Sequence, residues 1–577
     1  MDPRRVAHTL SRITNLLELN GVDRFRARAY RGAAEAIRGL TTDDITPMLR
    51  SGEIAALPGV GPATLGVITE LVETGESSYL DKLLESVPEG LTDVASVPGL
   101  TAAKAALLHR EIGVASLDDL EAAAMSGRLR TVRGFGDKTV ARIIRGVATV
   151  RGRSGHLRYR AARTEAERSA QQIATHPDIN RVELAGGLRR IANVVGELVL
   201  VAECSAQAED VLNSVATGSD VIDVERQGST LQIRFVDDTR ISLSFAETDS
   251  FAVRLWRATG SIEHVNAVLS HAAARGVSIH EDHASGPGGK VALHTEADIY
   301  TAAGLSFIVP ELREGRGEVE ASATGRLPEL ISSGDIRGVL HCHSDYSDGA
   351  VPIAEMAAAA RERGWSYVGI SDHSQAAFYA GGLKPGDIGR QHEEIDRLNA
   401  GMKQFRILKG IECDILADGS LDYDAVVRNQ FDYVIGSIHS RFSMSRAEMT
   451  ARILTAMDDP SLTILAHPTG RLLLERDPYD VDLDAVIEKA AATGVVIELN
   501  ADPARLDLDW SWCRIARDRG VIIEIGPDAH SPRGLDHTWF GVSLARKAWL
   551  RADQVFNTRS AEQIIEFAGM KNGNVHR

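Results

Sequence analysis

The segment GVLHCHSDYSDG (338–349) decides the fold of the C-terminal half. It starts as a short apolar run and continues into two histidines, His341 and His343, with Asp348 five residues further on. Alternation along a strand places both imidazoles on one face and Cys342 on the other. The segment therefore predicts a buried strand whose carboxyl end carries candidate metal ligands.

Similar runs follow along the rest of this half. Apolar runs alternate with helical stretches, and this alternation predicts a parallel sheet. Seven runs favour a distorted (β/α) barrel, which keeps its chemistry at the carboxyl ends of its strands. The runs span residues 338–341, 366–371, 405–412, 431–439, 462–467, 494–500 and 520–526.

Imidazole and carboxylate side chains stand at the ends of these runs. One histidine alone is more often a core or surface residue, but nine donors around six run ends predict a multinuclear metal site. Donors without thiolate suit Mn²⁺, Zn²⁺ or Fe²⁺, and nine of them fit two or three divalent ions better than one. Glu412 is the expected bridge between ions. The candidate ligands are His341, His343, Asp348, His373, Glu412, His439, His467, Asp528 and His530.

Other polar residues adjoin these candidate ligands. Arg441 and Arg471 closely follow ligand histidines, and either is a candidate catalytic donor to a phosphate oxygen, with a surface salt bridge as the alternative. Asn500, which ends the sixth run, is a candidate for the mouth of the barrel. Asp372 and Asp414 stand beside ligands and are candidates to orient imidazoles.

Three N-terminal segments share a turn with glycine followed by an amphipathic helix. They are LPGVGPATLGVITELVETG (57–75), VPGLTAAKAALLHREIG (97–113) and VRGFGDKTVARIIRGV (132–147), and the second is the weakest match. The N-terminus of such a helix offers backbone N–H groups to a phosphate oxygen. The candidate contacts with a DNA backbone are Gly59, Gly61, Gly99, Gly134, Gly136, Lys138 and Arg142.

Composition excludes several protein classes. The chain has 577 residues, 44% hydrophobic and 25% charged, as in globular proteins of several domains. There is no apolar run of about 18 residues and no secretory signal pattern at the start, so a cytoplasmic protein without a membrane span is expected. The net charge is −16, yet residues 131–163 hold nine bases and one acid, a pattern that favours contact with phosphate.

The segment NGVDRFRARAYRGAAEAIRGL (20–40) precedes the first glycine turn. Its residues Phe25, Ala29, Ala33 and Ile37 lie at helical spacing, which predicts an amphipathic helix. Together with the turns, which resemble helix-hairpin-helix motifs, it is similar to the amino-terminal domain of X-family DNA polymerases. Some members of that family carry a lyase lysine where this chain has Val67, so the resemblance implies no lyase activity here.

The segment RVELAGGLRRIANVVGELVLVAEC (181–204) resembles the palm signature of the same polymerase family. The resemblance implies three metal-binding aspartates, but the matching positions hold Glu197, Val199 and Ser242. Two Mg²⁺ ions about 3.5–4 Å apart need several carboxylates around them. We therefore expect a degenerate palm that has lost nucleotidyl transfer.

The C-terminal half resembles the PHP (polymerase and histidinol phosphatase) phosphoesterase domain, with all nine metal positions of that family present. Nearly the whole chain is similar to bacterial X-family polymerases fused to such a domain. The expected fold is a multidomain mixture of α+β and α/β parts. It comprises a helix-hairpin-helix domain (1–88), a fingers-like helical domain with two such motifs (89–150), a degenerate palm (151–246), a thumb-like domain (247–325) and a (β/α)7 PHP barrel (326–577).

The resemblance implies a metal-dependent 3′-5′ exonuclease, favouring manganese, or a nuclease that cleans DNA ends or abasic sites. It would hold DNA by the backbone without reading sequence. Three alternatives stay open: an active polymerase with a proofreading exonuclease, a phosphatase acting on small phosphomonoesters, and a non-catalytic DNA-binding scaffold.

Overall fold

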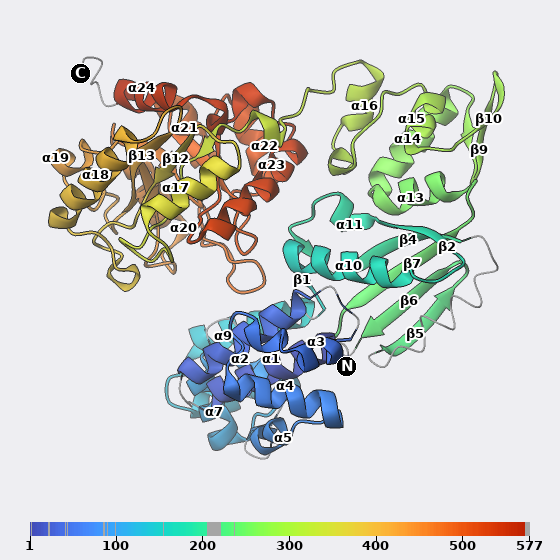
Figure 1. Ribbon diagram of the computed structural model, residues 1–577, viewed down its shortest axis with the longest axis horizontal. Coiled ribbons are helices and arrows are strands. Elements are labelled where there is room, and N and C mark those ends of the chain that lie inside the picture. The colour runs from blue at the N-terminus through green and yellow to red at the C-terminus, as the bar shows by residue number, and fades with distance from the viewer. Residues whose placement is uncertain are drawn as a thin grey trace.

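The computed structural model describes residues 1–571 except residues 2, 21–23, 41, 43, 85–86, 89, 98–99, 154, 205–220 and 236. Figure 1 shows a helical N-terminal part, a central part with two sheets, and a C-terminal barrel in yellow to red. None of the helices in the described part combines the length and the apolar character needed to cross a bilayer.

The N-terminal part is a bundle of helices around one core. Leu10 and Ile13 of α1 are buried in the same core as Tyr30 and Ile37 of α2. The helices are α1 (Pro3–Leu19), α2 (Arg24–Arg38), α3 (Thr46–Ser51), η1 (Ile54–Ala56), α4 (Pro62–Thr74), α5 (Ser78–Leu84), α6 (Leu91–Ala95), α7 (Ala102–Ile112), α8 (Leu117–Met125), η2 (Arg128–Thr131) and α9 (Asp137–Arg153).

The buried face of α2 differs from the expected one. Tyr30, Ala33 and Ile37 are buried, but Phe25 is 80% exposed and Ala29 is also exposed. The apolar spacing therefore predicted the helix but assigned two residues to the wrong face. Ala27, which is 1% exposed, lies on the buried face instead.

The central part begins with a five-stranded sheet of order β2–β4–β7–β6–β5, in which β4 and β7 run parallel. The helices α10 and α11 pack against β4. The elements are β1 (Leu157–Arg158), α10 (Tyr159–Ile173), β2 (Ile179–Leu184), α11 (Gly186–Arg189), β3 (Val194–Val195), β4 (Leu198–Cys204), β5 (Val221–Gln227), β6 (Thr230–Phe235) and β7 (Arg240–Ala246).

A smaller unit follows, with a three-stranded antiparallel sheet and four helices around Trp256 and Tyr300, both fully buried. Its elements are α13 (Phe251–Thr259), α14 (Ile262–Ala274), β8 (Ser278–Ile279), β9 (His283–Gly286), β10 (Gly289–Ala292), α15 (Glu296–Ala303), η3 (Pro310–Leu312) and α16 (Glu318–Ala323).

The C-terminal part is the predicted seven-stranded parallel barrel. Its strands follow chain order, and a parallel bridge between Cys342 and Ala529 joins the two edges of the sheet. The strands are β11 (Gly338–Val339), β12 (Tyr367–Ile370), β13 (Arg406–Asp414), β14 (Tyr433–Ser437), β15 (Leu462–Leu465), β16 (Val496–Asn500) and β17 (Ile523–Gly526).

Helices connect the strands along the outside of the barrel (Figure 1). They are η4 (Ser333–Asp335), α17 (Ile353–Glu362), η5 (Phe378–Ala380), α18 (Pro385–Ala400), α19 (Ala425–Arg428), α20 (Arg446–Ala456), α21 (Leu483–Thr493), α22 (Trp510–Asp518), η6 (Pro532–His537), α23 (Thr538–Lys547), η7 (Ala552–Gln554), η8 (Phe556–Thr558) and α24 (Ala561–Lys571). The fold class expected from the sequence is confirmed.

The barrel contacts the central part through loops that follow its strands. The Arg158 guanidinium donates to the Leu473 carbonyl at 2.9 Å and pairs with Glu475. Asn193 donates to Asp509 at 2.8 Å. Because both loops leave the carboxyl ends of barrel strands, this end of the barrel borders the β1 and β3 region.

Candidate metal centre

The nine candidate ligands converge at the carboxyl ends of the barrel strands. Glu412 lies within β13, and the others lie on the short segments that follow β11, β12, β14, β15 and β17. His467 and Asp528 have positive φ angles of 27° and 49°. Such strained backbone in non-glycine residues persists only where the surrounding structure holds it, and it clusters at functional sites.

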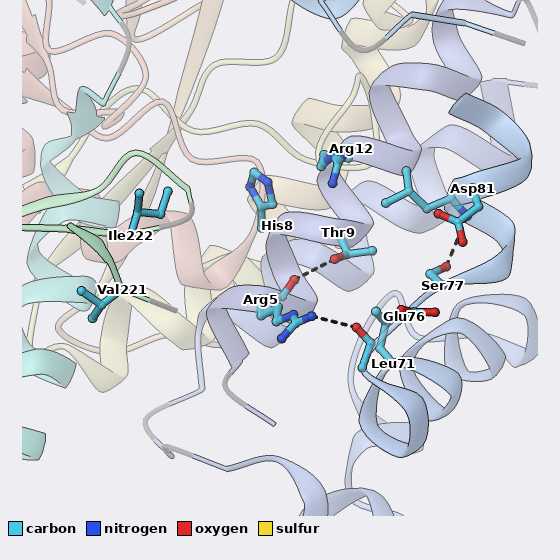
Figure 2. Close-up of a pocket in the computed structure, with 12 residues that line it drawn as sticks. Arg5, His8, Thr9, Arg12, Leu71, Glu76, Ser77, Asp81, Val221 and Ile222 are labelled. Atoms are coloured by element: carbon cyan, nitrogen blue, oxygen red, sulfur yellow. Dashed lines mark hydrogen bonds between the residues drawn. The ribbon is translucent and has the colours of Figure 1, made fainter. Parts of the chain in front are cut away.

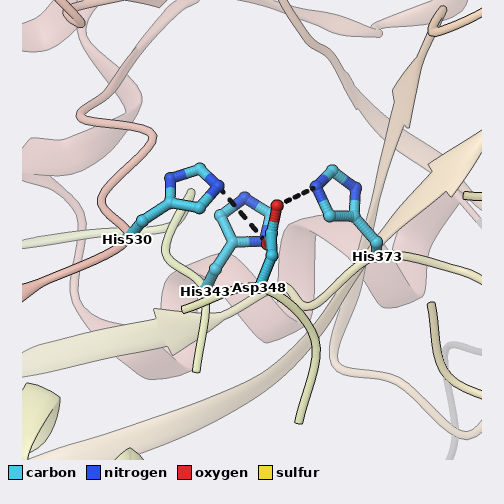
Figure 3. Close-up of side chains that lie close together, drawn as sticks. All are labelled: His343, Asp348, His373 and His530. Carbon is cyan, nitrogen blue, oxygen red and sulfur yellow. Dashed lines mark ion pairs between the residues drawn. The ribbon is translucent and has the colours of Figure 1, made fainter. Parts of the chain in front are cut away.

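The nine side chains form four overlapping groups, and within each group the candidate ligand atoms lie within 4.8 Å of one another. Figure 3 shows the group that lies nearest to solvent, in which the His530 side chain is 42% and the Asp348 side chain 35% exposed. The groups are His343, Asp348, His373 and His530; His341, Glu412 and His467; His341, His343 and Asp528; and His373, Glu412 and His439.

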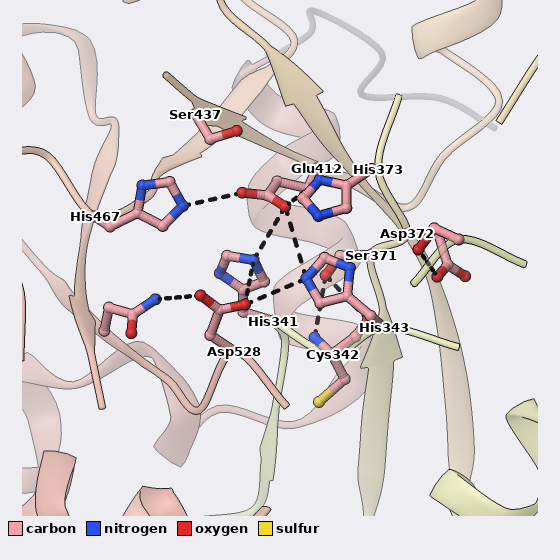
Figure 4. A network of polar contacts seen from close by, with 12 residues as sticks. His341, Cys342, His343, Ser371, Asp372, His373, Glu412, Ser437, His467 and Asp528 are labelled. Atoms are coloured by element: carbon pink, nitrogen blue, oxygen red, sulfur yellow. Dashed lines mark hydrogen bonds and ion pairs between the residues drawn. The ribbon is translucent and has the colours of Figure 1, made fainter. Parts of the chain in front are cut away.

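Glu412 stands between two sets of imidazoles (Figure 4). Its Oε2 lies 3.5 Å from Nε2 of His341 and 2.8 Å from Nδ1 of His373. Its Oε1 lies 3.3 Å from Nε2 of His439 and 3.0 Å from Nε2 of His467. Glu412 thus contacts these four imidazoles and belongs to two of the four groups, which makes it the candidate ligand shared between them.

Several buried atoms of this cluster lack a hydrogen bond among the described residues. They are Nε2 of His341, both ring nitrogens of His343, Nδ1 of His373, Oε2 of Glu412 and Nδ1 of His467. Some of these atoms lie within ion-pair distance of each other, as Nδ1 of His373 does with Oε2 of Glu412, but none of them makes a hydrogen bond within the described part of the chain. Buried polar atoms without hydrogen bonds are rare in native proteins, so several of them together need an explanation. Divalent cations would satisfy this donor set, and the residues fit such a group.

The charges of the cluster influence one another strongly. Burial alone would lower the pKa of His373, but the carboxylates of Glu412 and Asp348 raise it to about 10. The same balance raises the pKa values of His439 and His530 to about 9. Burial lowers the pKa of His343 to about 4. The site thus combines neutral and protonated imidazoles around ionised carboxylates.

Three ligand imidazoles are oriented through their second ring nitrogen. Nδ1 of His439 lies 2.7 Å from Asp414, as the sequence predicted, and Nδ1 of His530 lies 2.9 Å from the Asp528 carbonyl. Nδ1 of His341 lies 2.6 Å from the buried carboxylate of Glu498. Such partners fix the ring and its tautomer.

Sequence reasoning missed Glu498, although a glutamate inside the apolar run GVVIELN was a visible signal. Asn500 is fully buried and donates to Asp528 at 3.1 Å, so it lies deeper than the mouth. Asp372 accepts hydrogen bonds from Ser344, Ser347 and Gln391 rather than from an imidazole.

The two arginines predicted as phosphate donors differ in environment. Arg441 is exposed. The Arg471 guanidinium donates to the Arg505 carbonyl at 2.9 Å and to the Leu506 carbonyl, and it lies 3.5 Å from Asp509. Arg471 thus holds the loop at Arg505 and Leu506, and its side chain is mostly buried rather than at the surface.

That loop carries a cation that sequence reasoning missed. Nε of Arg505 lies 3.3 Å from Oδ2 of Asp528, and its side chain is 18% exposed. Its charge also acts on Glu412 and His467. No local motif signalled Arg505, since only the return of the loop after β16 brings it to the cluster.

The predicted DNA contacts lie on two turns at the surface of the helical part. Gly59 has φ +83°, and a Cβ there would lie 2.7 Å from the carbonyl carbon of Gly32, so the turn requires glycine. The Gly61 amide donates to Thr64 within its own turn. Gly134 has φ +95°.

The third turn lines a shallow hollow of about 440 Å³ with Gly134, Gly136 and Arg133. Arg142 is exposed on the helix that follows. Asp137, the one acid of the basic segment, pairs with Arg130 at 2.7 Å. Gly99 lies outside the described residues, as does the side chain of Lys138.

The palm positions carry no comparable cluster. Val199 and Ser242 are direct neighbours in register on β4 and β7, and Ser242 accepts a hydrogen bond from Gln232 at 3.1 Å. A Cβ on Gly186 would lie 2.8 Å from Val199, so the valine packs against that turn. Glu197 is exposed. Among the described residues, every group able to hold a metal lies in the barrel.

A further hollow lies between the helical part and β5, far from this cluster (Figure 2). Arg5 donates to the Gly75 carbonyl at 2.8 Å, and Thr9 donates to the Arg5 carbonyl at 3.0 Å. The Arg5 bond ties α1 to the end of α4, and the Thr9 bond lies within α1.

Comparison with known families agrees with this architecture. The chain matches a helix-hairpin-helix domain over residues 1–77 and a SAM-like helix-hairpin-helix tandem over 91–149. It matches the DNA polymerase beta thumb over 254–314 and the PHP domain over 340–501. Helix-hairpin-helix and thumb domains imply DNA binding.

Relatives fall into two kinds. A "Probable phosphatase" of Syntrophotalea carbinolica is 27% identical over 40% of this chain and 95% of its own length. A probable phosphatase of Clostridium acetobutylicum is 32% identical over 22% of this chain and 52% of its own length. The "DNA polymerase/3'-5' exonuclease PolX" of Bacillus subtilis is 35% identical over 98% of this chain and 99% of its own length. The chain therefore belongs to the bacterial X-family DNA polymerases that carry a C-terminal PHP domain.

Proposed function

We propose that the chain is a metal-dependent DNA 3′-5′ exonuclease or end-processing phosphodiesterase that acts at the barrel mouth. The observation that carries the proposal is the set of nine donors gathered around Glu412, with buried atoms that lack hydrogen bonds. The relative from Bacillus subtilis is named as a polymerase and 3′-5′ exonuclease.

We assign the nine side chains as ligands of two or three ions, with Mn²⁺, Zn²⁺ or Fe²⁺ as candidates. Bound there, such ions would supply Lewis-acid polarisation of a phosphate and a nucleophilic water near neutral pH. Glu412 contacts the imidazoles of His373 and His467 with its two oxygens and so fixes the separation of these two rings. Glu498 and Asp414 fix the rings of His341 and His439.

Arg505 is the stronger candidate for contact with a non-bridging phosphate oxygen, because its guanidinium lies beside Asp528 at the cluster. Arg441 remains a second candidate at the exposed rim. Arg471 is a weaker one, since its guanidinium already holds two carbonyls and approaches Asp509.

We further propose that nucleotidyl transfer in the palm is lost. Val199 and Ser242 offer no carboxylate, and Glu197 alone cannot hold two Mg²⁺ ions. The two palm arginines are already paired with the thumb. Arg189 lies 2.6 Å from Glu296, and Arg190 lies 3.1 Å from Glu314.

The remaining domains position DNA in this proposal. Residues 1–88 and 89–150 hold the backbone through the glycine turns without reading sequence, and 151–246 and 247–325 form the inactive palm and thumb. Arg158 on β1 contacts the loop after β15, so the barrel at 326–577 opens beside them.

A labelled primer–template tests the proposal. With Mn²⁺ alone we expect shortening of the primer from its 3′ end, and with dNTPs added to an E412Q variant we expect no extension. A phosphatase of small monoesters is the alternative that the probable-phosphatase relatives favour. Phosphate release from histidinol phosphate together with an intact primer would support that alternative instead.

A further inference from the structure

Two aromatic side chains stand exposed beside the candidate metal centre. Phe378 is 85% exposed, the largest fraction of any large apolar side chain in the described part of the chain, and Tyr379 is 62% exposed. Single exposed apolar residues are ordinary, but adjacent aromatic rings beside a polar site are not. The pair lies in η5 (Phe378–Ala380), which begins five residues after the candidate ligand His373.

The rings lie close to the ligands. The Tyr379 ring centroid is 6.4 Å from that of His439, with the ring planes at 76°. The Phe378 and Tyr379 centroids are 6.0 Å apart at 79°. The carboxylates of Asp414, Glu412 and Asp348 all act on the Tyr379 hydroxyl. Tyr379 therefore borders the cluster itself.

The backbone under these rings is firmly held. The Ser374 amide donates to the Glu412 carbonyl at 2.9 Å, and the Leu383 amide donates to the His373 carbonyl at 2.8 Å. The Ala376 amide donates to Asp422 at 2.8 Å. A Cβ on Gly382 would lie 1.9 Å from the Ser374 carbonyl oxygen, so the loop closes tightly there. Fixed backbone with exposed rings is the arrangement of a preformed contact surface.

We propose that Phe378 and Tyr379 form a stacking platform for the unpaired nucleobase of the terminal nucleotide whose phosphodiester is cleaved. The inference rests on the proposed nuclease function. A base joined through one sugar to a phosphate at the ligands lies within reach of the Tyr379 ring. Aromatic rings hold unpaired bases without regard to sequence, because every base has a π-face. The platform thus makes a frayed or single-stranded 3′ end the preferred substrate.

The test compares two single-stranded oligonucleotides that differ only at the last residue. One ends in an ordinary nucleotide and the other in an abasic tetrahydrofuran residue with the same phosphodiester. For the wild-type chain with Mn²⁺ we expect about a tenfold lower KM on the base-bearing end, the size of one stacking contact. In the F378A/Y379A variant the two KM values should become equal.

Conservative variants distinguish the contribution of the aromatic ring from that of the Tyr379 hydroxyl. Y379F and F378W keep the preference if stacking carries it, whereas equal loss in Y379F and Y379A overturns the proposal in favour of a hydroxyl contact. V426A removes a similarly exposed apolar side chain (76% exposed) from α19 of the same barrel and leaves the preference intact. Because all three side chains are exposed, thermal unfolding should not change.

A binding readout does not depend on turnover. With EDTA present, 2-aminopurine at the 3′ terminus should be quenched on binding to the wild type but not to F378A/Y379A. Equal cleavage of both ends by the wild type overturns the platform alone. No cleavage of either oligonucleotide with Mn²⁺ overturns the proposed nuclease function instead, so the two failures are distinguishable.

Discussion

The barrel mouth carries the candidate metal centre, and the palm-like sheet carries the positions that resemble a polymerase site. The two regions differ in how their polar atoms are paired. At the mouth, Glu412, His341 and His343 keep buried atoms without a hydrogen-bond partner among the described residues. In the palm, Ser242 is satisfied by Gln232, and Val199 packs against Gly186.

The loss of a metal site that we propose for the palm would account for this difference. A site that binds cations tolerates unpaired ligand atoms, because the ion supplies their partner. A site that no longer binds them can pair or replace those atoms within the protein. The palm arginines follow the same pattern, since Arg189 and Arg190 are paired with thumb glutamates.

The largest expected effect comes from E412Q, which keeps the shape of the side chain but removes the charge that faces both imidazole sets. We expect nuclease activity to fall about a thousandfold or more, since metal ions supply several kcal/mol of charge stabilisation. The measurement is kcat/KM on a labelled primer, with thermal unfolding as the control for folding. Retained activity with an unchanged unfolding temperature would contradict the site.

Proton competition gives the next largest effect. The pKa values of His373, about 10, and of His439 and His530, about 9, lie above neutral pH in the metal-free chain. Protons on these rings compete with metal, so apparent affinity should rise between pH 7 and pH 9, by about tenfold per pH unit for each proton displaced.

Calorimetry of Mn²⁺ binding in buffers of different ionisation enthalpy counts these protons. The stability of the metal-free chain should change in the opposite direction. A raised histidine pKa stabilises the fold below the unfolded-state value and loses this contribution as pH rises through about 9 to 10. Metal affinity that is constant from pH 7 to pH 9 would contradict the assigned ligands.

A smaller effect sharpens the role of Glu498. E498Q weakens the bond to Nδ1 of His341, so metal affinity should fall about 10- to 100-fold. E524Q is the matched control, because burial and the neighbouring Glu498 raise the pKa of Glu524 to about 8 and leave it mostly neutral at pH 7. An equal loss in both variants would assign the effect to general packing of the barrel interior.

The smallest effect belongs to the palm. E197A and S242A should leave the nuclease rate and the metal content unchanged within about twofold, because neither side chain reaches the barrel cluster. The same labelled primer and metal analysis measure both. A large loss in either variant would show that the palm takes part in the chemistry.

The sequence predicted the barrel and the convergence of the candidate ligands because both signals are local. Apolar runs mark buried strands, and a histidine or acid just after such a run must lie at the strand's carboxyl end. The same reasoning made Asp414 a candidate to orient an imidazole, and its carboxylate lies 2.7 Å from Nδ1 of His439. Burial against a partner helix is not local, so Phe25 and Ala29 were assigned to the wrong face of α2.

Contacts made by returning loops escaped the sequence as well. Arg471 stands four residues after His467 but turns to the carbonyls of Arg505 and Leu506. Arg505 follows the sixth apolar run, which contains no candidate ligand. Its guanidinium nevertheless lies 3.3 Å from Asp528. Glu498 was missed because its partner, Nδ1 of His341, lies on a distant segment of the sequence.

Metal content tests the central claim most directly. Inductively coupled plasma mass spectrometry on the wild-type chain loaded with Mn²⁺ should find two to three ions per chain. That number should be unchanged in the E197A/S242A double variant and should fall in E412Q. An ion count that drops with the palm substitutions and survives E412Q would contradict the account.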